Sequence, residues 1–173
     1  MNYFKYRQKI PADFDDDSRV WIYQSNRQFN SKEALELSDA LHRFIPQWKA
    51  HGMNVKGFGE LFFDRWIMLM ADEKQTGVSG CSTDSMFRLI KDIEQRFHAH
   101  LLDRQSLAFI INESVTVIPL DQLKQNLENG RLKQESLYFN NTVQTKKEFQ
   151  DQWLIPLKES WIARKFAVSL GTS

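Results

Sequence analysis

The sequence predicts an α+β fold of the ferredoxin-like type, and three observations support this prediction. Short stretches rich in β-branched and aromatic residues alternate with longer stretches in which apolar residues recur every three or four positions. Their order over residues 18–118 is strand, helix, strand, strand, helix, strand. This βαββαβ order favours an antiparallel sheet with both helices on one face. The length of 173 residues suits one domain.

The sequence also predicts how the chain is divided. Residues 1–17 lack apolar periodicity and are expected to form a loosely attached N-terminal arm, whose aspartates favour a solvated turn over a calcium loop. Residues 18–173 are expected to form a single α+β domain. Its βαββαβ core covers residues 18–118, and a C-terminal extension covers residues 119–173. We expect this extension to pack on the core, because about 55 residues bury little surface by themselves.

The first strand and the first helix follow one another closely. Residues 19–25 are rich in β-branched and aromatic side chains and predict a strand. Asn30, with Glu33 three residues later, is typical of a helix capping box. Gly52 is expected to end the helix in the left-handed conformation, and Pro46 to kink or shorten it. The apolar stripe of this helix comprises Ala34, Leu37, Leu41, Phe44, Ile45 and Trp48.

Further strands are expected at residues 55–63, 66–72, 106–111 and 115–118. Tight turns at Asp64-Arg65 and Asn112-Glu113 join them in pairs. The strand at residues 66–72 is apolar almost throughout, which is typical of a strand covered on both faces. Before the third of these strands, a loop of small residues at 77–85 leads into the second helix. The stripe of that helix comprises Met86, Ile90, Ile93 and Phe97.

The C-terminal extension has weaker signals. Three leucines at helical spacing, closed by Asn129-Gly130, predict a short helix. Residues 136–141 favour an edge strand or an extended loop. Thr145 is expected to cap another helix, and residues 158–166 to form a final helical turn or two.

Composition excludes several classes of function. The 23 basic and 22 acidic residues give a net charge of +1, which disfavours a strongly electrostatic nucleic-acid or membrane-surface binder. The single cysteine, Cys81, excludes an internal disulfide and a four-cysteine zinc site. His98 and His100 are two residues apart on a helix and therefore point to different faces. We expect neither a metal ion nor a cofactor.

The compartment is expected to be the cytoplasm. The first residues lack the apolar run of a signal peptide. The most apolar stretch, residues 66–71, is far shorter than the roughly 20 residues that a membrane span needs.

The loop before the second helix is the most informative local feature. Amide groups at a helix N-terminus attract anions, and the same field lowers the pKa of a thiol. Three interpretations therefore stay open: helix capping with packing, an anion or small-molecule site, and a cysteine nucleophile. The last lacks a nearby histidine, since His98 lies about 25 Å along the helix. The residues concerned are Ser79, Gly80, Cys81, Ser82, Thr83, Asp84 and Ser85.

Polar residues of the extension are further candidates. Asn140, Asn141 and Arg164 offer amide and guanidinium groups. They could line a pocket if the extension packs near the Cys81 loop. The alternative interpretation is that the two asparagines form a turn and that Trp161 fills the core.

Four stretches carry a family resemblance: residues 18–27 (SRVWIYQSNR), 79–85 (SGCSTDS), 139–143 (FNNTV) and 156–161 (PLKESW). In them the chain resembles a small bacterial family whose members often bear the label "ABC transporter ATPase". The resemblance spans nearly the whole chain and implies no activity, substrate or cofactor.

The label itself fails a chemical test. ATP hydrolysis of that kind needs a glycine-rich loop that ends in Gly-Lys-Ser or Gly-Lys-Thr. The nearest stretch, residues 52–59, has Phe58 in place of the lysine. Such an ATPase also needs a Walker-B aspartate at the end of an apolar strand, and Asp72 is the one candidate for it. We therefore interpret the label as a misannotation and exclude ATP hydrolysis.

The sequence thus predicts a binding or interaction module that takes a small anionic ligand or a protein partner. A homodimer formed through the sheet or an aromatic patch fits such a fold. The alternative is a cysteine-dependent enzyme that transfers or hydrolyses an acyl group at Gly80-Cys81.

Overall fold

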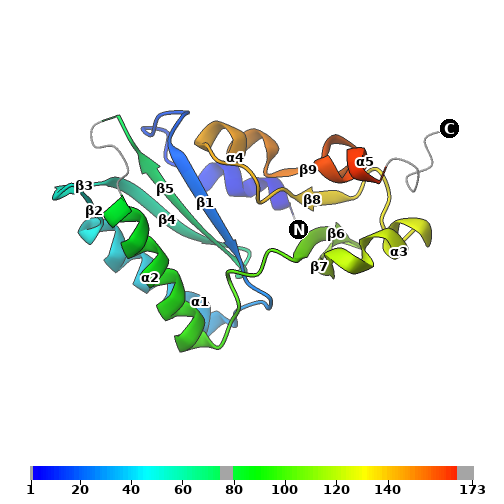
Figure 1. Ribbon diagram of the computed structural model, residues 1–173, viewed down its shortest axis with the longest axis horizontal. Helices are drawn as coiled ribbons and strands as arrows, with labels where there is room; N and C mark the ends of the chain where they lie inside the picture. The colour runs from blue at the N-terminus through cyan, green and yellow to red at the C-terminus, as the bar shows by residue number, and fades with distance from the viewer. Residues whose placement is uncertain (1, 75–79, 167–173) are drawn as a thin grey trace.

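The structure, a computed structural model, describes residues 2–74 and 80–166, and it has an α+β architecture (Figure 1). Three antiparallel strands in the order β1-β5-β4 form what we call the first sheet. Four antiparallel strands in the order β7-β6-β8-β9 form the second sheet. In Figure 1, α1 and α2 cover one face of the first sheet, and the second sheet lies at the other end of the molecule beside α3 and α5.

The strands are β1 (Arg19–Gln24), β2 (Lys49–Ala50), β3 (Met53–Asn54), β4 (Lys56–Phe62), β5 (Trp66–Asp72), β6 (Ser106–Ile111), β7 (Ser114–Pro119), β8 (Leu137–Phe139) and β9 (Leu154–Pro156). The α-helices are α1 (Ser31–Phe44), α2 (Gly80–Phe97), α3 (Leu123–Glu128), α4 (Lys146–Gln152) and α5 (Trp161–Lys165). The 3₁₀ helices are η1 (Tyr3–Lys9), η2 (Ile45–Gln47), η3 (Leu120–Gln122) and η4 (Leu157–Glu159).

Strand β5 is the centre of the first sheet and is buried along its whole length. On one face it meets the apolar stripes of α1 and α2, and all four residues expected to form the stripe of α2 are buried. On the other face it meets aromatic residues of η1, α4 and β8. The close fit includes Gly57 of β4, where a Cβ atom would lie 2.8 Å from the Trp48 ring. This double cover explains why β5 reads as a continuous apolar run.

The ferredoxin-like topology is not confirmed, because the expected fourth strand does not join the first sheet. That strand, β6, forms a hairpin with β7 through Asn112 and Glu113, both with positive φ, and it pairs with β8 on its other side. The hairpin and β8 satisfy both edges of β6 within the second sheet. As a result, β1 lies at an edge of the first sheet.

The boundaries of the first helix differ from the prediction in a way that proline explains. The capping box is confirmed, since the Asn30 side chain accepts from the Glu33 amide and the Glu33 side chain accepts from the Asn30 amide. The helix ends at Phe44 rather than at Gly52, because Pro46 lies in the following η2. Gly52 instead forms, together with His51, the positive-φ turn of the β2-β3 hairpin.

The N-terminal arm is packed firmly rather than loosely attached. Tyr6 is 2% exposed, and its hydroxyl donates to the carbonyl oxygens of Phe149 and Gln150 at 3.0 Å each. Phe14 is also buried, and its carbonyl oxygen accepts a hydrogen bond from the buried Lys146 ammonium. The apolar residues of the arm thus cover the face of the first sheet that α1 and α2 leave open.

The extension follows the prediction in its helices but not in its strand. Gly130 has a φ of +75° after α3, and the Thr145 side chain caps α4 by accepting from the Glu148 amide. Residues 137–139 form an inner strand between β6 and β9, not an edge strand. A search of the described residues for a membrane-spanning helix, judged by length and hydropathy, finds none.

Candidate functional site

The residues that the sequence singled out around Cys81 lie at the start of α2. Ser79 lies outside the described residues, and so does the side chain of Cys81. The helix begins at Gly80, so the residues that follow belong to its first turns and not to a loop. This is a correction of the expected loop at 77–85.

The start of α2 is tied to the rest of the fold through Ser82. Ser82 is fully buried, and its carbonyl oxygen accepts from the Trp48 indole at 3.0 Å and from the Ser85 hydroxyl at 2.9 Å. Thr83 and Asp84 are exposed. These contacts are those of a packed helix start, and the anion site and the nucleophile stay predictions.

The three candidate residues of the extension have separate places. The Asn140 side chain accepts from the Thr142 hydroxyl at 2.6 Å and so forms the turn that the alternative interpretation expects. Arg164 is exposed on α5. Asn141 donates to the Gln24 side chain at 2.9 Å.

Asn141 and α2 lie on opposite faces of the first sheet. Side chains alternate along a strand. Trp21 and Tyr23 of β1 pack with α1 and α2, whereas Val20 and Ile22 pack in the cluster that contains Trp153. The side-chain amide oxygen of Asn141 accepts from the Trp153 indole at 3.0 Å. The structure therefore does not bring Asn141 to the Cys81 region.

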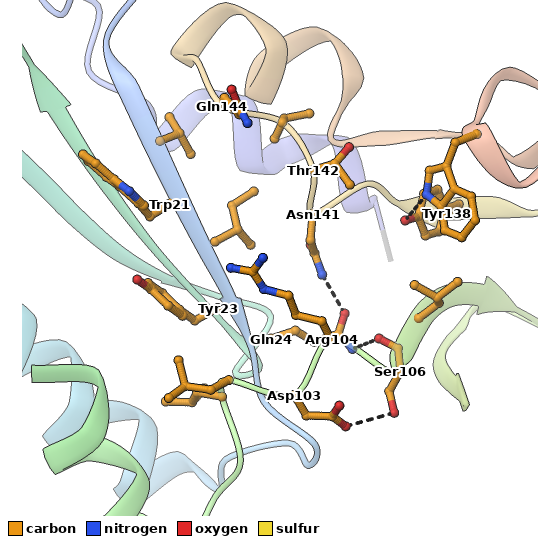
Figure 2. Close-up of a pocket in the computed structure, with 17 residues that line it drawn as sticks. Trp21, Tyr23, Gln24, Asp103, Arg104, Ser106, Tyr138, Asn141, Thr142 and Gln144 are labelled. Atoms are coloured by element: carbon orange, nitrogen blue, oxygen red, sulfur yellow. Dashed lines mark hydrogen bonds between the residues drawn. The ribbon is translucent and has the colours of Figure 1, made fainter. Parts of the chain in front are cut away.

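A cavity of about 420 Å³ lies beside β1 and includes Asn141 in its lining (Figure 2). Three parts of the chain surround it: β1 itself, residues 101–104 together with the first two residues of β6, and Tyr138 of β8 together with residues 141–144. Trp161 of α5 completes the wall. Asn140 and Arg164 do not line it.

A polar network centred on the buried Gln24 fixes the floor of this cavity. The Gln24 amide nitrogen donates to the Ser106 carbonyl at 3.1 Å, and its amide oxygen accepts from Asn141 and, at 3.2 Å, from the Trp66 indole. One side chain thus joins β1, β5, the start of β6 and the segment after β8. A buried polar network of this kind holds its members in one arrangement when all are satisfied.

Arg104 is the single cation among the described residues that line the cavity. Figure 2 shows its guanidinium in the middle of the lining residues. Within the described part of the chain, it has neither an ion pair nor a hydrogen bond to another residue. The neighbouring Asp103 is engaged elsewhere, since its carboxylate accepts from the Gln105 amide at 2.7 Å and from the Ser106 hydroxyl at 3.4 Å.

Two tyrosines of the lining stay neutral at physiological pH. Burial raises the pKa of Tyr23, and the positive charge of Arg104 offsets part of this rise. Burial also raises the pKa of Tyr138, whose hydroxyl accepts from the Trp161 indole at 3.2 Å. The cavity therefore combines aromatic walls with one guanidinium, Arg104, that has no ion pair among the described residues, and one carboxylate, Asp103.

The backbone of β1 forms one side of the cavity. All five residues from Val20 to Gln24 line it. Their side chains point alternately to the two faces of the sheet, so what all five can present to the cavity is the backbone at the edge of the strand. At one end of this edge the Val20 amide donates to the Gln144 carbonyl at 2.8 Å, and at the other the Asn26 amide donates to the His100 carbonyl at 3.0 Å. In an antiparallel strand, every second residue directs its amide and carbonyl groups to the same edge. Ile22 alternates with Val20 and Asn26, so its amide and carbonyl face the cavity. The hydrogen bonds of the described residues give the Ile22 amide no acceptor.

Arg104 and the strand edge were missed by the sequence analysis. Residues 101–105 show no periodicity and match no motif, so nothing marks Arg104 among the basic residues of the chain. The edge depends on which strand pairs with β1, which local sequence does not encode.

Comparisons of the chain with protein-family models, with curated proteins and with solved structures found no match. The resemblance to the bacterial family stays a prediction. The description of the site therefore rests on its geometry.

Among the described residues, no group of three or more histidine, cysteine, aspartate or glutamate side chains could hold a metal ion. His98 and His100 are both exposed.

Proposed function

We propose that this protein is a non-catalytic binding module and that it takes a ligand with a negatively charged group in the cavity beside β1. The observation that carries this proposal is Arg104, whose guanidinium reaches into the cavity without a partner among the described residues. A guanidinium binds carboxylates and phosphates through paired, charge-assisted hydrogen bonds.

The surroundings of Arg104 suit such a ligand. A volume of about 420 Å³ is in the usual range for ligand cavities, which is roughly 300–1,000 Å³. Trp21, Tyr23, Tyr138 and Trp161 offer apolar surface, and Asn141 and Thr142 offer hydrogen-bonding groups. The described lining residues include no histidine, cysteine or lysine, so the cavity favours binding over covalent catalysis.

The order β1-β5-β4 supports a related proposal about the fold. In a ferredoxin-like sheet the last strand pairs with the free edge of the first. We infer that the first sheet is a ferredoxin-like sheet whose fourth strand is diverted into the second sheet. The cavity then occupies the place of the missing strand. The cytoplasmic location and the homodimer stay predictions.

The cysteine-dependent enzyme is a separate hypothesis, because α2 lies on the other face of the first sheet. Alkylation of Cys81 as a function of pH tests it. An activated nucleophile gives an apparent pKa well below the ordinary value of about 8.5, and an inert thiol removes the hypothesis.

Thermal unfolding with a panel of acetate, N-acetylglutamate, phosphate and sulfate tests the proposed site. The expected result is a raised melting temperature with at least one anion, because a ligand at a hundredfold excess over its dissociation constant stabilises by about 2.7 kcal/mol. Arg104→Gln should abolish the shift. Arg88→Gln is the matched control, since Arg88 is exposed on α2 at the opposite face.

Two results would contradict the proposal. The first is that no anion of the panel changes the melting temperature. The second is that Arg104→Gln shows the same rise in melting temperature with the effective anion as the wild type and the control Arg88→Gln.

A further inference from the structure

The edge of β1 is covered at both ends and open in the middle. Gln144 accepts from the Val20 amide, and His100 accepts from the Asn26 amide. Between these two contacts, the outward-facing groups are the amides of Ile22 and Gln24 and the carbonyls of Val20, Ile22 and Gln24. The backbone hydrogen bonds of the described residues include no partner for them.

From this gap we propose that the edge of β1 binds the C-terminal end of another polypeptide. The bound end adds a short strand to the first sheet, and its terminal carboxylate pairs with Arg104. This inference rests on the proposed function and names its ligand class.

The open backbone groups argue for a peptide. An extended peptide supplies an N–H and a C=O for each group that the edge leaves unpaired, which is how strand addition gives affinity without reading side chains. A small carboxylate engages Arg104 but leaves Ile22 unpaired.

The closed ends argue for a chain terminus. Val20 and Asn26 are six residues apart, which is about 20 Å along a strand. A strand that ran through the gap would collide with the backbone at both Gln144 and His100. A terminus enters from solvent at one point and stops inside, so about three or four residues fit.

The charge of the lining argues for the carboxyl end. Arg104 is the single cation among the described lining residues. The lining also holds the Asp103 carboxylate, but that group already accepts from Gln105 and Ser106, so Arg104 is the charged group left to pair with a ligand. An ammonium at the N-terminal end of a peptide would meet repulsion from Arg104. Alternate side chains of the peptide would contact Trp21 and Tyr23 on one face and Asn141 on the other.

Selection from a library of random four-residue C-terminal sequences tests this inference, followed by binding measurements on the best sequence. Fluorescence anisotropy compares three forms of the peptide: the free acid, its C-terminal amide, and the acid with methylated backbone nitrogens. The free acid should bind about tenfold or more tightly than either of the others, because each modification removes one class of hydrogen bond.

Protein variants complete the test. Arg104→Gln should remove the preference for the acid over the amide, and Arg88→Gln should retain it. Ile22→Pro removes an amide that makes no bond to β5, and it should weaken binding of the acid. If Ile22→Pro does not fold, the methylated peptide carries this part of the test alone.

The outcomes separate this inference from the proposed function. If small carboxylates bind at Arg104 but the library yields no peptide, the cavity is a small-anion site and the strand inference is overturned. The same holds if the amide or the methylated peptide binds as tightly as the free acid. If neither peptides nor small anions bind, both proposals fall.

Discussion

Two regions on opposite faces of the first sheet compete as functional sites, and they are built in different ways. The start of α2 is a continuous stretch, residues 80–85, whose polar groups are recognisable in the sequence. The cavity beside β1 is assembled from segments far apart, and the Gln24–Asn141 contact joins residues 117 positions apart. In the first region the Ser82 carbonyl is bonded twice within the fold. In the second, Arg104 and the Ile22 amide have no partner among the described residues.

The difference teaches that a conspicuous local motif and an available binding group need not coincide. Ser, Thr and Asp near a helix start are what the helix itself requires. Arg104, in contrast, is exposed in the connection between α2 and β6 and has no ion pair or hydrogen bond among the described residues. We therefore expect variants in the two regions to behave differently.

The largest expected effect is on stability and comes from Gln24→Leu. The leucine leaves the Trp66 indole and the Asn141 amide without their acceptor, which should cost about 2–4 kcal/mol of unfolding free energy in urea denaturation. Ser85→Ala at the start of α2 should cost less than about 1 kcal/mol. Equal losses would show that the Gln24 network is no more important than the helix start.

The next effect separates the two neighbouring asparagines. Asn141→Ala removes the acceptor of the buried Trp153 indole and should cost about 1–3 kcal/mol in the same measurement. Asn140→Ala removes contacts within an exposed turn and should cost about 0.5–1 kcal/mol. The reverse order would place the network around Asn140.

The start of α1 provides a reference for a helix start closed by side chains. Asn30→Ala should cost about 1 kcal/mol. The Glu33 carboxylate accepts hydrogen bonds from the Arg27 guanidinium and from the Asn30 amide, and these lower its pKa to about 2. Because the pKa of Glu33 is lower in the folded than in the unfolded state, the ionised carboxylate stabilises the folded protein at pH values above the ordinary glutamate pKa. This stabilisation is lost as the pH falls toward 2. By NMR titration, Arg27→Gln should raise the pKa of Glu33, and an unchanged value would contradict the pairing.

The smallest expected effect is on the pKa of Tyr23, and it shows whether the Arg104 guanidinium points into the cavity. Removal of a positive charge disfavours a nearby phenolate, so Arg104→Gln should raise the pKa of Tyr23 further. The pKa of Tyr138, whose rise comes from burial and is opposed by the Trp161 hydrogen bond, should change less than that of Tyr23. A spectroscopic pH titration measures both, and an unchanged Tyr23 would mean that Arg104 points away from the cavity.

Local features could be predicted from the sequence because short-range physics decides them. The strand at residues 19–25, the Asn30 cap and the buried stripe of α2 all follow from spacing and side-chain chemistry. The positive-φ turn at Asn112 and Glu113 is confirmed for the same reason.

The partner of β6 could not be predicted, because β1 and β8 offer similar apolar strands and the choice between them is made by tertiary packing. The cavity is the consequence of that choice. Arg104 and the edge of β1 therefore carried no local signal. Asn141 was identified as a polar candidate, but the pocket considered for it depended on the extension packing near the Cys81 loop.

Amide hydrogen exchange along β1, followed residue by residue by NMR in the free protein, tests the open edge most directly. Trp21 and Tyr23 donate toward β5, so their amides should exchange slowly. The Ile22 amide should exchange at least about tenfold faster than both, because none of the described residues accepts a hydrogen bond from it. Protection of Ile22 equal to that of its two neighbours would show that the edge is already paired and would contradict the proposed site.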